Sequence, residues 1–425
     1  MAESVRNVRR QAGSEQTSRL SPGGSVANSG RTTMRATEHT ALIPVFIFAG
    51  SAAAMVLSQA LTRLLPAKYF YDAAKIRALV VTGDTVNDRA FDSVASVLRL
   101  TSLSEGTLSL VVLTIFSFCV WRVLRLVPAD VMPGRIVGGV AMSYLLCSVY
   151  LMRYSKEFVI LAIVYLVLTA AESMRGDLLI VASIVSYSIY FRPYWILVAV
   201  GFIGLRFVGK RWSSTRLVLT VAVVICVSVA VALRVRYGEA DIFRETVNAV
   251  RSRSPDARTS LGRVSPSAGI AGDALNSVAT MVLLVFPVPI LLRSGLVFAA
   301  IGLGLAGIWI EFFSGLNTFT WVGSGQREVA RARAACLVLA LLAVQAQFEP
   351  DLGSALRHVS PLLPLILLVS CGADGQRAKT LTLASRTGHA RSKREHRGGL
   401  EKHSRAFKWM MPVPRTDLAR QNSSR

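Results

Sequence analysis

The stretch Leu217–Leu233 reads LVLTVAVVICVSVAVAL and contains no charged residue. About 20 helical residues cross the hydrocarbon core of a bilayer, and a run of this length and apolarity is close to that requirement. In lipid the backbone amides find no water to pair with, so a segment that crosses alone must be helical. The stretch therefore predicts a transmembrane helix.

Similar runs recur along the 425 residues, of which 52% are hydrophobic and 17% charged. A typical soluble domain has about 25% charged residues, so this composition excludes soluble enzyme folds. The sequence predicts an all-α fold, a polytopic transmembrane helix bundle. Its apolar segments lie at about 41–61, 107–121, 136–152, 158–171, 178–191, 194–209, 217–233, 278–292, 295–313, 334–347 and 361–371.

Basic residues between these segments predict the orientation, because cytoplasmic loops of membrane proteins are rich in Lys and Arg. Three connections are basic and are expected in the cytoplasm: 122–135, 210–216 and 314–333. Pro287 and Pro289 interrupt the segment 278–292, which we therefore interpret as re-entrant or interfacial. About ten crossings remain, in a multi-pass protein of the bacterial cytoplasmic membrane.

Two large extracytoplasmic loops follow from this topology, 62–106 and 234–294. The second holds an amphipathic stretch with Phe243 and Val247 on its apolar face, which fits either an interfacial helix or a lid on the bundle. The dipeptide Arg192-Pro193 either divides two helices or kinks one long helix.

The two tails, residues 1–40 and 372–425, carry about half of the net charge of +23 and few apolar residues. We predict that both are disordered, basic and cytoplasmic, flanking a helical domain at 41–371. Contact with anionic lipids explains the charge better than nucleic-acid binding, which we do not expect. The five cysteines lie in or beside apolar segments without metal-binding spacing, so we expect packing roles and no metal site.

The residues able to carry chemistry gather at helix ends on the predicted outer face. The catalytic candidates are Glu349, Asp351, His358 and Asp72, and the candidates for holding a diphosphate are Arg153, Lys156, Arg192 and Arg357. Carboxylates or a histidine serve as general bases, and arginines neutralise phosphates. Snorkelling cations, a helix-capping acid and local ion pairs are the structural alternatives for the same residues. Motifs for nucleotides, dinucleotides or hydrolases are missing, so no cofactor is expected.

Five short stretches carry a family resemblance: YFYDAAKI (69–76), YSKEFVIL (154–161), YFRPYW (190–195), VFPVP (285–289) and FEPDLGSALRHVSPLLPLILL (348–368). In this order they resemble the Wzy-like repeat-unit polymerases and the related EpsG-like proteins of bacterial polysaccharide gene clusters. The resemblance implies polymerisation of polyprenyl-diphosphate-linked oligosaccharide units at the outer face of the cytoplasmic membrane. It also implies diphosphate binding by Arg153, Arg192 and Arg357.

Three functions remain open from the sequence. A polymerase, our leading expectation, needs the arginines and a base among Glu349, Asp351 and His358. A GT-C-type glycosyltransferase using a polyprenyl-phosphate sugar donor would place its base at Asp72. A lipid-linked saccharide flippase needs the arginines but no base. A chain-length regulator or another polysaccharide-assembly protein is a further expected partner.

Overall fold

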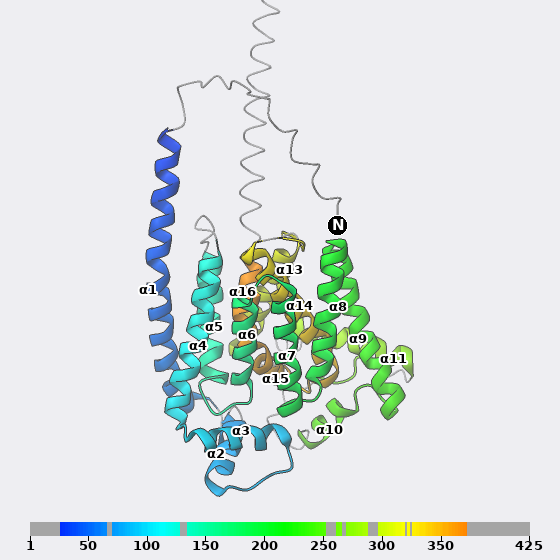
Figure 1. Cartoon of the computed structure of the whole chain (residues 1–425). Coiled ribbons are helices and arrows are strands. Elements are labelled where there is room, and N and C mark those ends of the chain that lie inside the picture. Colours follow the sequence, from blue (N-terminus) through cyan, green and yellow to red (C-terminus); the bar gives the residue numbers. More distant parts are fainter. Residues whose placement is uncertain are drawn as a thin grey trace, which may run out of the picture.

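The computed structural model describes residues 26–65, 70–127, 134–251, 261–265, 269–287, 296–318, 321–323 and 325–371. Every regular element within these ranges is a helix, so the all-α prediction is confirmed (Figure 1). The elements are α1 (Val26–Leu64), α2 (Tyr71–Thr82), α3 (Arg89–Thr101), α4 (Glu105–Leu126), α5 (Gly134–Tyr150), η2 (Glu157–Val159), α6 (Ile160–Thr169), α7 (Met174–Tyr190), α8 (Trp195–Trp212), α9 (Thr215–Tyr237), α10 (Ile242–Arg251), α11 (Ile270–Val285), α13 (Leu296–Leu316), α14 (Gln326–Phe348), α15 (Leu352–Val359), η3 (Ser360–Leu362) and α16 (Leu363–Ser370).

Helix α14 forms the centre of the bundle and packs against α6, α8, α9, α11 and α16. Its residues from Val329 to Gln347 are all buried. The sequence predicted residues 314–333 as a loop, but α14 already begins at Gln326 and carries Arg331 and Arg333 into the interior. That prediction of the loop boundary is wrong at its C-terminal end.

The two buried arginines are stable there because they pair with the ends of neighbouring helices. The last carbonyl groups of a helix lack partners within it and attract cations. Arg331 donates to the carbonyl oxygens of Gly315 (3.4 Å) and Val369 (3.1 Å), near the ends of α13 and α16. Arg333 donates to the carbonyl oxygens of Ala170 (2.9 Å), Ala171 (2.7 Å) and Ser173 (3.2 Å), just past α6.

Five helical stretches are long and apolar enough to cross a membrane: Leu42–Leu64, Glu105–Leu126, Thr215–Tyr237, Gln326–Phe348 and Leu352–Ser370. Four shorter apolar helices accompany them: Ile136–Tyr150, Glu157–Thr169, Ile270–Val285 and Gly302–Leu316. These helices indicate a multi-pass membrane protein. The predicted number of crossings stays a prediction.

Arg192-Pro193 divides two helices, α7 and α8, which pack against each other. The segment 278–292 also differs from a simple span. Helix α11 starts earlier than predicted, at Ile270, packs on α9 and α14, and ends before Pro287. Residues 288–295, including Pro289, lie outside the described part of the chain.

Helices α2, α3 and α10, which belong to the connections 65–104 and 238–269 of the sequence, lie at one end of the bundle (Figure 1). One polar residue of α10 faces the protein: Arg244 is 1% exposed. Phe243, 41% exposed, still packs against the rings of Tyr237 and Phe348. Arg244 donates to Thr280 Oγ1 (2.6 Å) and to Asp241 (3.2 Å). Both sequence alternatives stay open, because the helix covers the bundle while Phe243 and Val247 remain partly exposed.

Helix α1 packs on α4 and α5 and begins at Val26, inside the predicted N-terminal tail. Extending an existing helix costs far less free energy than starting one, so the apolar part of α1 can propagate into this polar stretch. Residues 1–25 and 372–425 lie outside the described ranges, so the predictions for the tails stay predictions. All five cysteines are buried and none forms a disulfide within the described part of the chain, as expected of packing residues.

Candidate functional site

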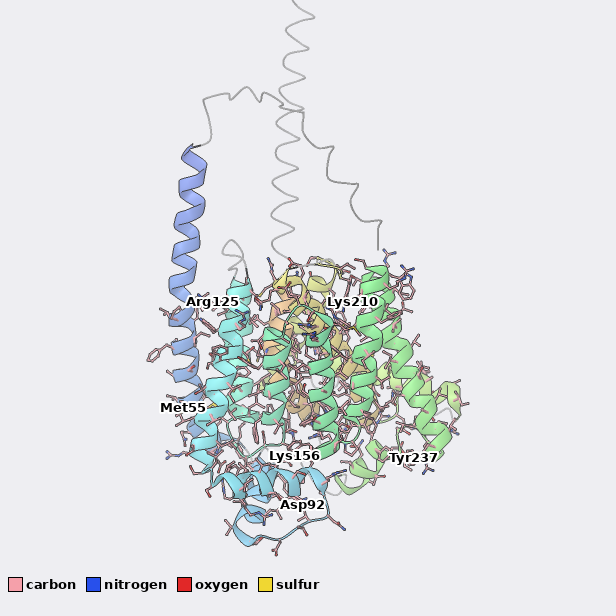
Figure 2. The ribbon with its side chains drawn as sticks, in the orientation of Figure 1. Met55, Asp92, Arg125, Lys156, Lys210 and Tyr237 are labelled. Carbon is pink, nitrogen blue, oxygen red and sulfur yellow. The ribbon has the colours of Figure 1, made fainter. Side chains whose placement is uncertain are left out.

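Seven charged or titratable side chains meet at the end of the bundle that carries α2, α3 and α10. We call them the charged cluster: Asp72, Lys156, Glu157, Arg192, Glu349, Arg357 and His358. Lys156 lies at this end in Figure 2, opposite Lys210. Six of the eight residues predicted for the site are therefore brought together from four separate parts of the chain.

Helix ends place these residues at the same level of the bundle. Lys156 and Glu157 lie at the turn before α6, and Arg192 lies between α7 and α8. Glu349 follows the last residue of α14, where Pro350 ends the helix because the residue before a proline disfavours the α conformation. Arg357 and His358 lie in the last turn of α15, which runs directly on through η3 into α16.

Glu157 is the centre of the cluster and is fully buried. Its Oε1 lies 2.7 Å from Nη2 of Arg192, 3.4 Å from Nε2 of His358 and 4.0 Å from Nε of Arg357. Arg192 also donates to the hydroxyl of Tyr194 (3.0 Å). Since an unpaired charge in a membrane interior is expensive, these partners explain how a carboxylate remains there.

His358 connects two carboxylates. Its Nδ1 hydrogen-bonds Oε1 of Glu349, and its Nε2 faces Glu157. Burial alone would raise the pKa of Glu349, but the charges of His358 and Arg192 and hydrogen bonds with His358 and Ser354 hold that pKa below its ordinary value. A carboxylate at Nδ1 orients the imidazole and leaves Nε2 as the nitrogen able to take up a proton.

Asp72 closes the cluster on its more open side. Its Oδ2 accepts a hydrogen bond from Nη1 of Arg357 and lies 3.5 Å from Nζ of Lys156. The ammonium group of Lys156 also lies 3.7 Å from the centre of the Phe91 ring on α3. Burial and the charge of Arg192 hold the pKa of Lys156 below its ordinary value, with Asp72 and Glu157 acting in the opposite direction.

The cluster contains buried polar atoms without a hydrogen-bond partner among the described residues. They are Oε2 of Glu157, Oε2 of Glu349, Nε of Arg192, Nε of Arg357 and Nε2 of His358. Buried polar groups are nearly always paired, so such a concentration marks a place where water or a polar ligand completes the network. The arrangement offers acceptors, donors and an oriented histidine in one place.

Two predicted site residues make their polar contacts elsewhere. Asp351 caps the N-terminus of α15, where it accepts a hydrogen bond from the amide of Ser354 (2.8 Å). Arg153 donates to the carbonyl oxygen of Ser58 and lies 3.8 Å from Glu105. Their predicted roles as base and diphosphate ligand stay predictions.

The sequence analysis weighed Glu157 either as a carboxylate acting beside Arg153 and Lys156 or as a helix-capping acid, and did not count it among the candidate site residues. One signal was available: Glu157 directly precedes the apolar run FVILAIVYLVL, so the carboxylate had to lie at a membrane boundary or deeper. Ionisable groups in that position are functional candidates by default.

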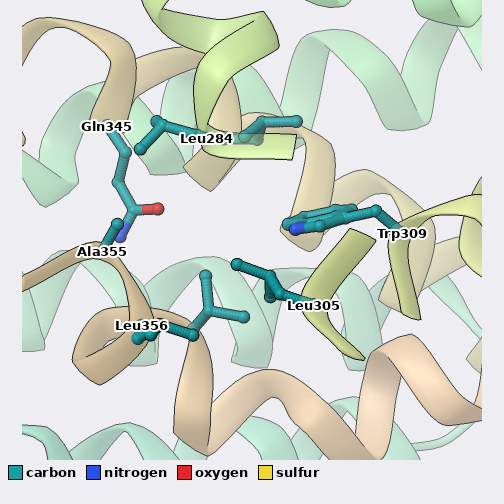
Figure 3. A pocket seen from close by; sticks show the side chains of 8 residues that line it. Leu284, Leu305, Trp309, Gln345, Ala355 and Leu356 are labelled. Carbon is teal, nitrogen blue, oxygen red and sulfur yellow. The ribbon is translucent and has the colours of Figure 1, made fainter. Parts of the chain in front are cut away.

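A mostly apolar pocket lies on the other face of α15 (Figure 3). Its cavity volume is only about 10 Å³, room for about one water molecule. It is lined by Leu284, Leu305, Trp309, Leu342, Gln345, Ala355, Leu356 and Val359. Nε2 of Gln345 and Nε1 of Trp309 are buried and unpaired within the described part of the chain. The pocket is therefore apolar with two free donors.

The best arrangement for a metal ion among the described residues lies outside the charged cluster. Carboxylate oxygens of Glu239, Asp241 and Glu245 come within 4.8 Å of one another. Nε of Arg263 lies 2.9 Å from Asp241 and 3.5 Å from Glu245, so a guanidinium group already supplies positive charge there. This network attaches α10 to its surroundings.

Comparison with known proteins adds no family: no protein-family model, curated protein or solved structure matches the chain. The site therefore has to be interpreted from its own chemistry.

Proposed function

We propose that the chain is a membrane polymerase that joins polyprenyl-diphosphate-linked oligosaccharide units into a surface polysaccharide, with the charged cluster as its active site. One observation carries the proposal: residues from four distant parts of the chain form a buried acid–base network at one end of a membrane-type helical bundle. Because burial of such groups is costly, they are expected where they act.

The proposed topology has ten crossings with the charged cluster on the outer face of the cytoplasmic membrane. This orientation rests on the short basic turns of the chain, because Arg175, Lys210 and Arg211 lie in or beside such turns at the opposite end, which would face the cytoplasm. Helix α11 is the re-entrant segment in this proposal, and the two outer connections are 65–104 and 238–269.

The proposed chemistry is a displacement at the anomeric carbon of the lipid-linked donor. His358, oriented by Glu349, takes the proton from an acceptor hydroxyl through Nε2. The hydroxyl oxygen forms the new bond to the anomeric carbon as the bond to the diphosphate oxygen breaks. Lys156, Arg192 and Arg357 stabilise the negative charge on the lipid diphosphate that leaves.

A second candidate is a flippase for lipid-linked saccharides. The succession of Glu349, His358 and Glu157 is the observation that favours it, since chains of carboxylates and histidines relay protons in transporters. A GT-C-type transferase with Asp72 as base is less well supported, because Oδ2 of that carboxylate already accepts a hydrogen bond from Arg357 and lies 3.5 Å from Nζ of Lys156.

The test is the size distribution of surface polysaccharide, together with the lipid-linked intermediates, in a strain that lacks this chain. The proposal expects long polymers to vanish while complete single repeat units persist on lipid at the outer face. Repeats that each lack one sugar would indicate the single-sugar transferase. Complete repeats trapped at the inner face would indicate the flippase.

Complementation by variants locates the active site. His358→Asn should restore no polymer although the protein is present in the membrane at the normal level. Arg211→Gln, an exposed arginine at the opposite end, is the matched control and should restore full-length polymer. Full polymer length with His358→Asn would refute the proposed base.

A further inference from the structure

Two cations of the charged cluster converge on a single carboxylate that arrives from a separate helical segment. Asp72 belongs to α2, whereas Lys156 precedes α6 and Arg357 lies on α15. Oδ2 of Asp72 is the meeting point: it accepts a hydrogen bond from Arg357 and lies 3.5 Å from Nζ of Lys156. Two converging cationic donors make a site suited to an oxyanion, and here an internal carboxylate fills it.

This part of the cluster is also the part that a ligand can reach. The side chains of Asp72, Lys156 and Arg357 are 16%, 11% and 20% exposed, whereas Glu157 and Glu349 behind them are at most 1% exposed. An anion arriving from the aqueous side would therefore meet Asp72 first. Carboxylate and phosphate oxygens compete for the same donors.

The net charge of the cluster also indicates that an anion can replace Asp72. With Asp72 in place, three carboxylates balance Lys156, Arg192 and Arg357; without it, the cations exceed the carboxylates by one. The cations also have partners other than Asp72. Arg192 pairs with Glu157, Lys156 lies over the ring of Phe91, and Nε of Arg357 lies 4.0 Å from Oε1 of Glu157. Removal of the Asp72 charge should leave a preformed anion site.

We propose that Lys156 and Arg357 form a phosphate subsite, and that Asp72 occupies it as an internal competitor which an incoming phosphate or diphosphate displaces. This inference rests on the proposed function only for the choice of phosphate as the anion. Asp72 is then a gate to the site and takes no proton from an acceptor.

The test is the affinity of the purified full-length protein in a nonionic detergent for inorganic diphosphate and for farnesyl diphosphate, measured by calorimetry. Asp72→Ala should bind both at least about tenfold more tightly than the wild type, because the competing carboxylate is gone. Arg357→Gln should bind both more weakly than the wild type. Unchanged or weaker binding by Asp72→Ala overturns the proposal.

Matched variants keep the outcome interpretable. Asp84→Asn removes an exposed carboxylate from the connection after α2 and should leave the affinity unchanged, which controls for net charge. If Asp72→Ala does not fold, Asp72→Asn removes the charge at constant shape and is judged by the same criterion. Tighter binding of farnesyl diphosphate alone means that the prenyl chain, not Asp72, governs access, and also overturns the proposal.

A second experiment distinguishes free diphosphate from lipid headgroups as the ligand of the subsite. Protein in nanodiscs of phosphatidylglycerol should show the same gain for diphosphate as protein in phosphatidylcholine nanodiscs; loss of the gain would mean that lipid headgroups fill the subsite and would overturn its assignment to diphosphate. Failure of the proposed function is a distinct result, because a strain with normal polymer refutes the polymerase while the tenfold gain in affinity still supports the gated subsite.

Discussion

Both ends of the bundle contain buried charged side chains, but the two sets differ in how completely their polar atoms are hydrogen-bonded. The charged cluster lies at one end. At the other end Asp177 accepts hydrogen bonds from Arg333 (2.6 Å) and Lys210 (2.7 Å), with Arg206 at 3.4 Å. We call these four residues the lock. Arg333 and Glu349 are separated by about 24 Å along α14, given a rise of about 1.5 Å per residue.

The difference lies in how completely the groups are paired. In the lock, Arg333 donates through Nε to Asp177 and through both Nη atoms to backbone carbonyls. Of the buried lock atoms, only Nε of Arg206 lacks a hydrogen bond among the described residues. The charged cluster leaves five such atoms. A paired network stabilises one structure, whereas an incompletely paired one is prepared for another molecule.

The largest effect is expected from breaking the lock. Arg333→Met leaves Asp177 with fewer partners and removes the guanidinium donor from the carbonyl groups of Ala170 and Ala171, so the free energy of unfolding should fall by about 3–5 kcal/mol. Thermal unfolding of the purified protein measures this loss. Arg175→Gln, an exposed arginine nearby, should be neutral. Normal stability of Arg333→Met would contradict the structural role of the lock.

The opposite result is expected from the charged cluster. Glu157→Gln keeps the shape but weakens the attraction for Arg192, Arg357 and His358, so the positions of the reacting groups change. Activity should fall by about 100-fold, while stability falls less than in Arg333→Met, because the glutamine amide oxygen still accepts a hydrogen bond from Arg192. Polymer assays and thermal unfolding on the same preparation decide it. Equal loss of stability and activity would remove the distinction between the two ends.

Gly176 lies next to Arg333 of the lock and leaves no room for a larger side chain. A Cβ atom added there would lie 2.6 Å from Nη2 of Arg333 and even closer to the carbonyl oxygen of Ala171, which is backbone and cannot move freely. Gly176→Ala should therefore destabilise the protein by about 1–3 kcal/mol, as overpacking does. Gly138→Ala is the control in unfolding experiments, because its Cβ would meet no atom within 4 Å.

Sequence patterns predicted the helices and much of the candidate site, because apolar length and the positions of prolines act locally. They placed Asp72, Lys156, Arg192 and Glu349 at helix ends, and the structure brings these side chains together. The burial of Arg333 could not be predicted in this way. Its partners lie about 160 residues earlier in the chain, and no local pattern reports that a helix end has unpaired carbonyl groups.

Two buried glutamines on α14 allow a comparison of a paired and an unpaired polar side chain in their contribution to stability. Gln347 accepts from Ser277 (2.9 Å) and donates to the carbonyl oxygen of Cys226 (3.2 Å), whereas Nε2 of Gln345 has no partner among the described residues. Both are 1% exposed. Gln347→Leu should lower the free energy of unfolding by about 1–3 kcal/mol, and Gln345→Leu should leave it unchanged or higher. Equal losses in unfolding experiments would mean that Gln345 has a partner after all.

The smallest effect concerns pH and Glu349, whose pKa lies below its ordinary value because the charges and hydrogen bonds around it outweigh its burial. Between the folded and the unfolded pKa, the unfolded carboxyl group binds more protons, so stability falls as the pH falls through this range, below about pH 4.3. Glu349→Gln lacks this dependence. The stability difference between wild type and variant, from unfolding in a nonionic detergent, should therefore be larger at pH 7 than at about pH 3.5. A difference of the same size at both pH values would mean that the partners of Glu349 do not stabilise its charged form. Ion pairing would then not explain how the Glu349 carboxylate remains buried in the charged cluster.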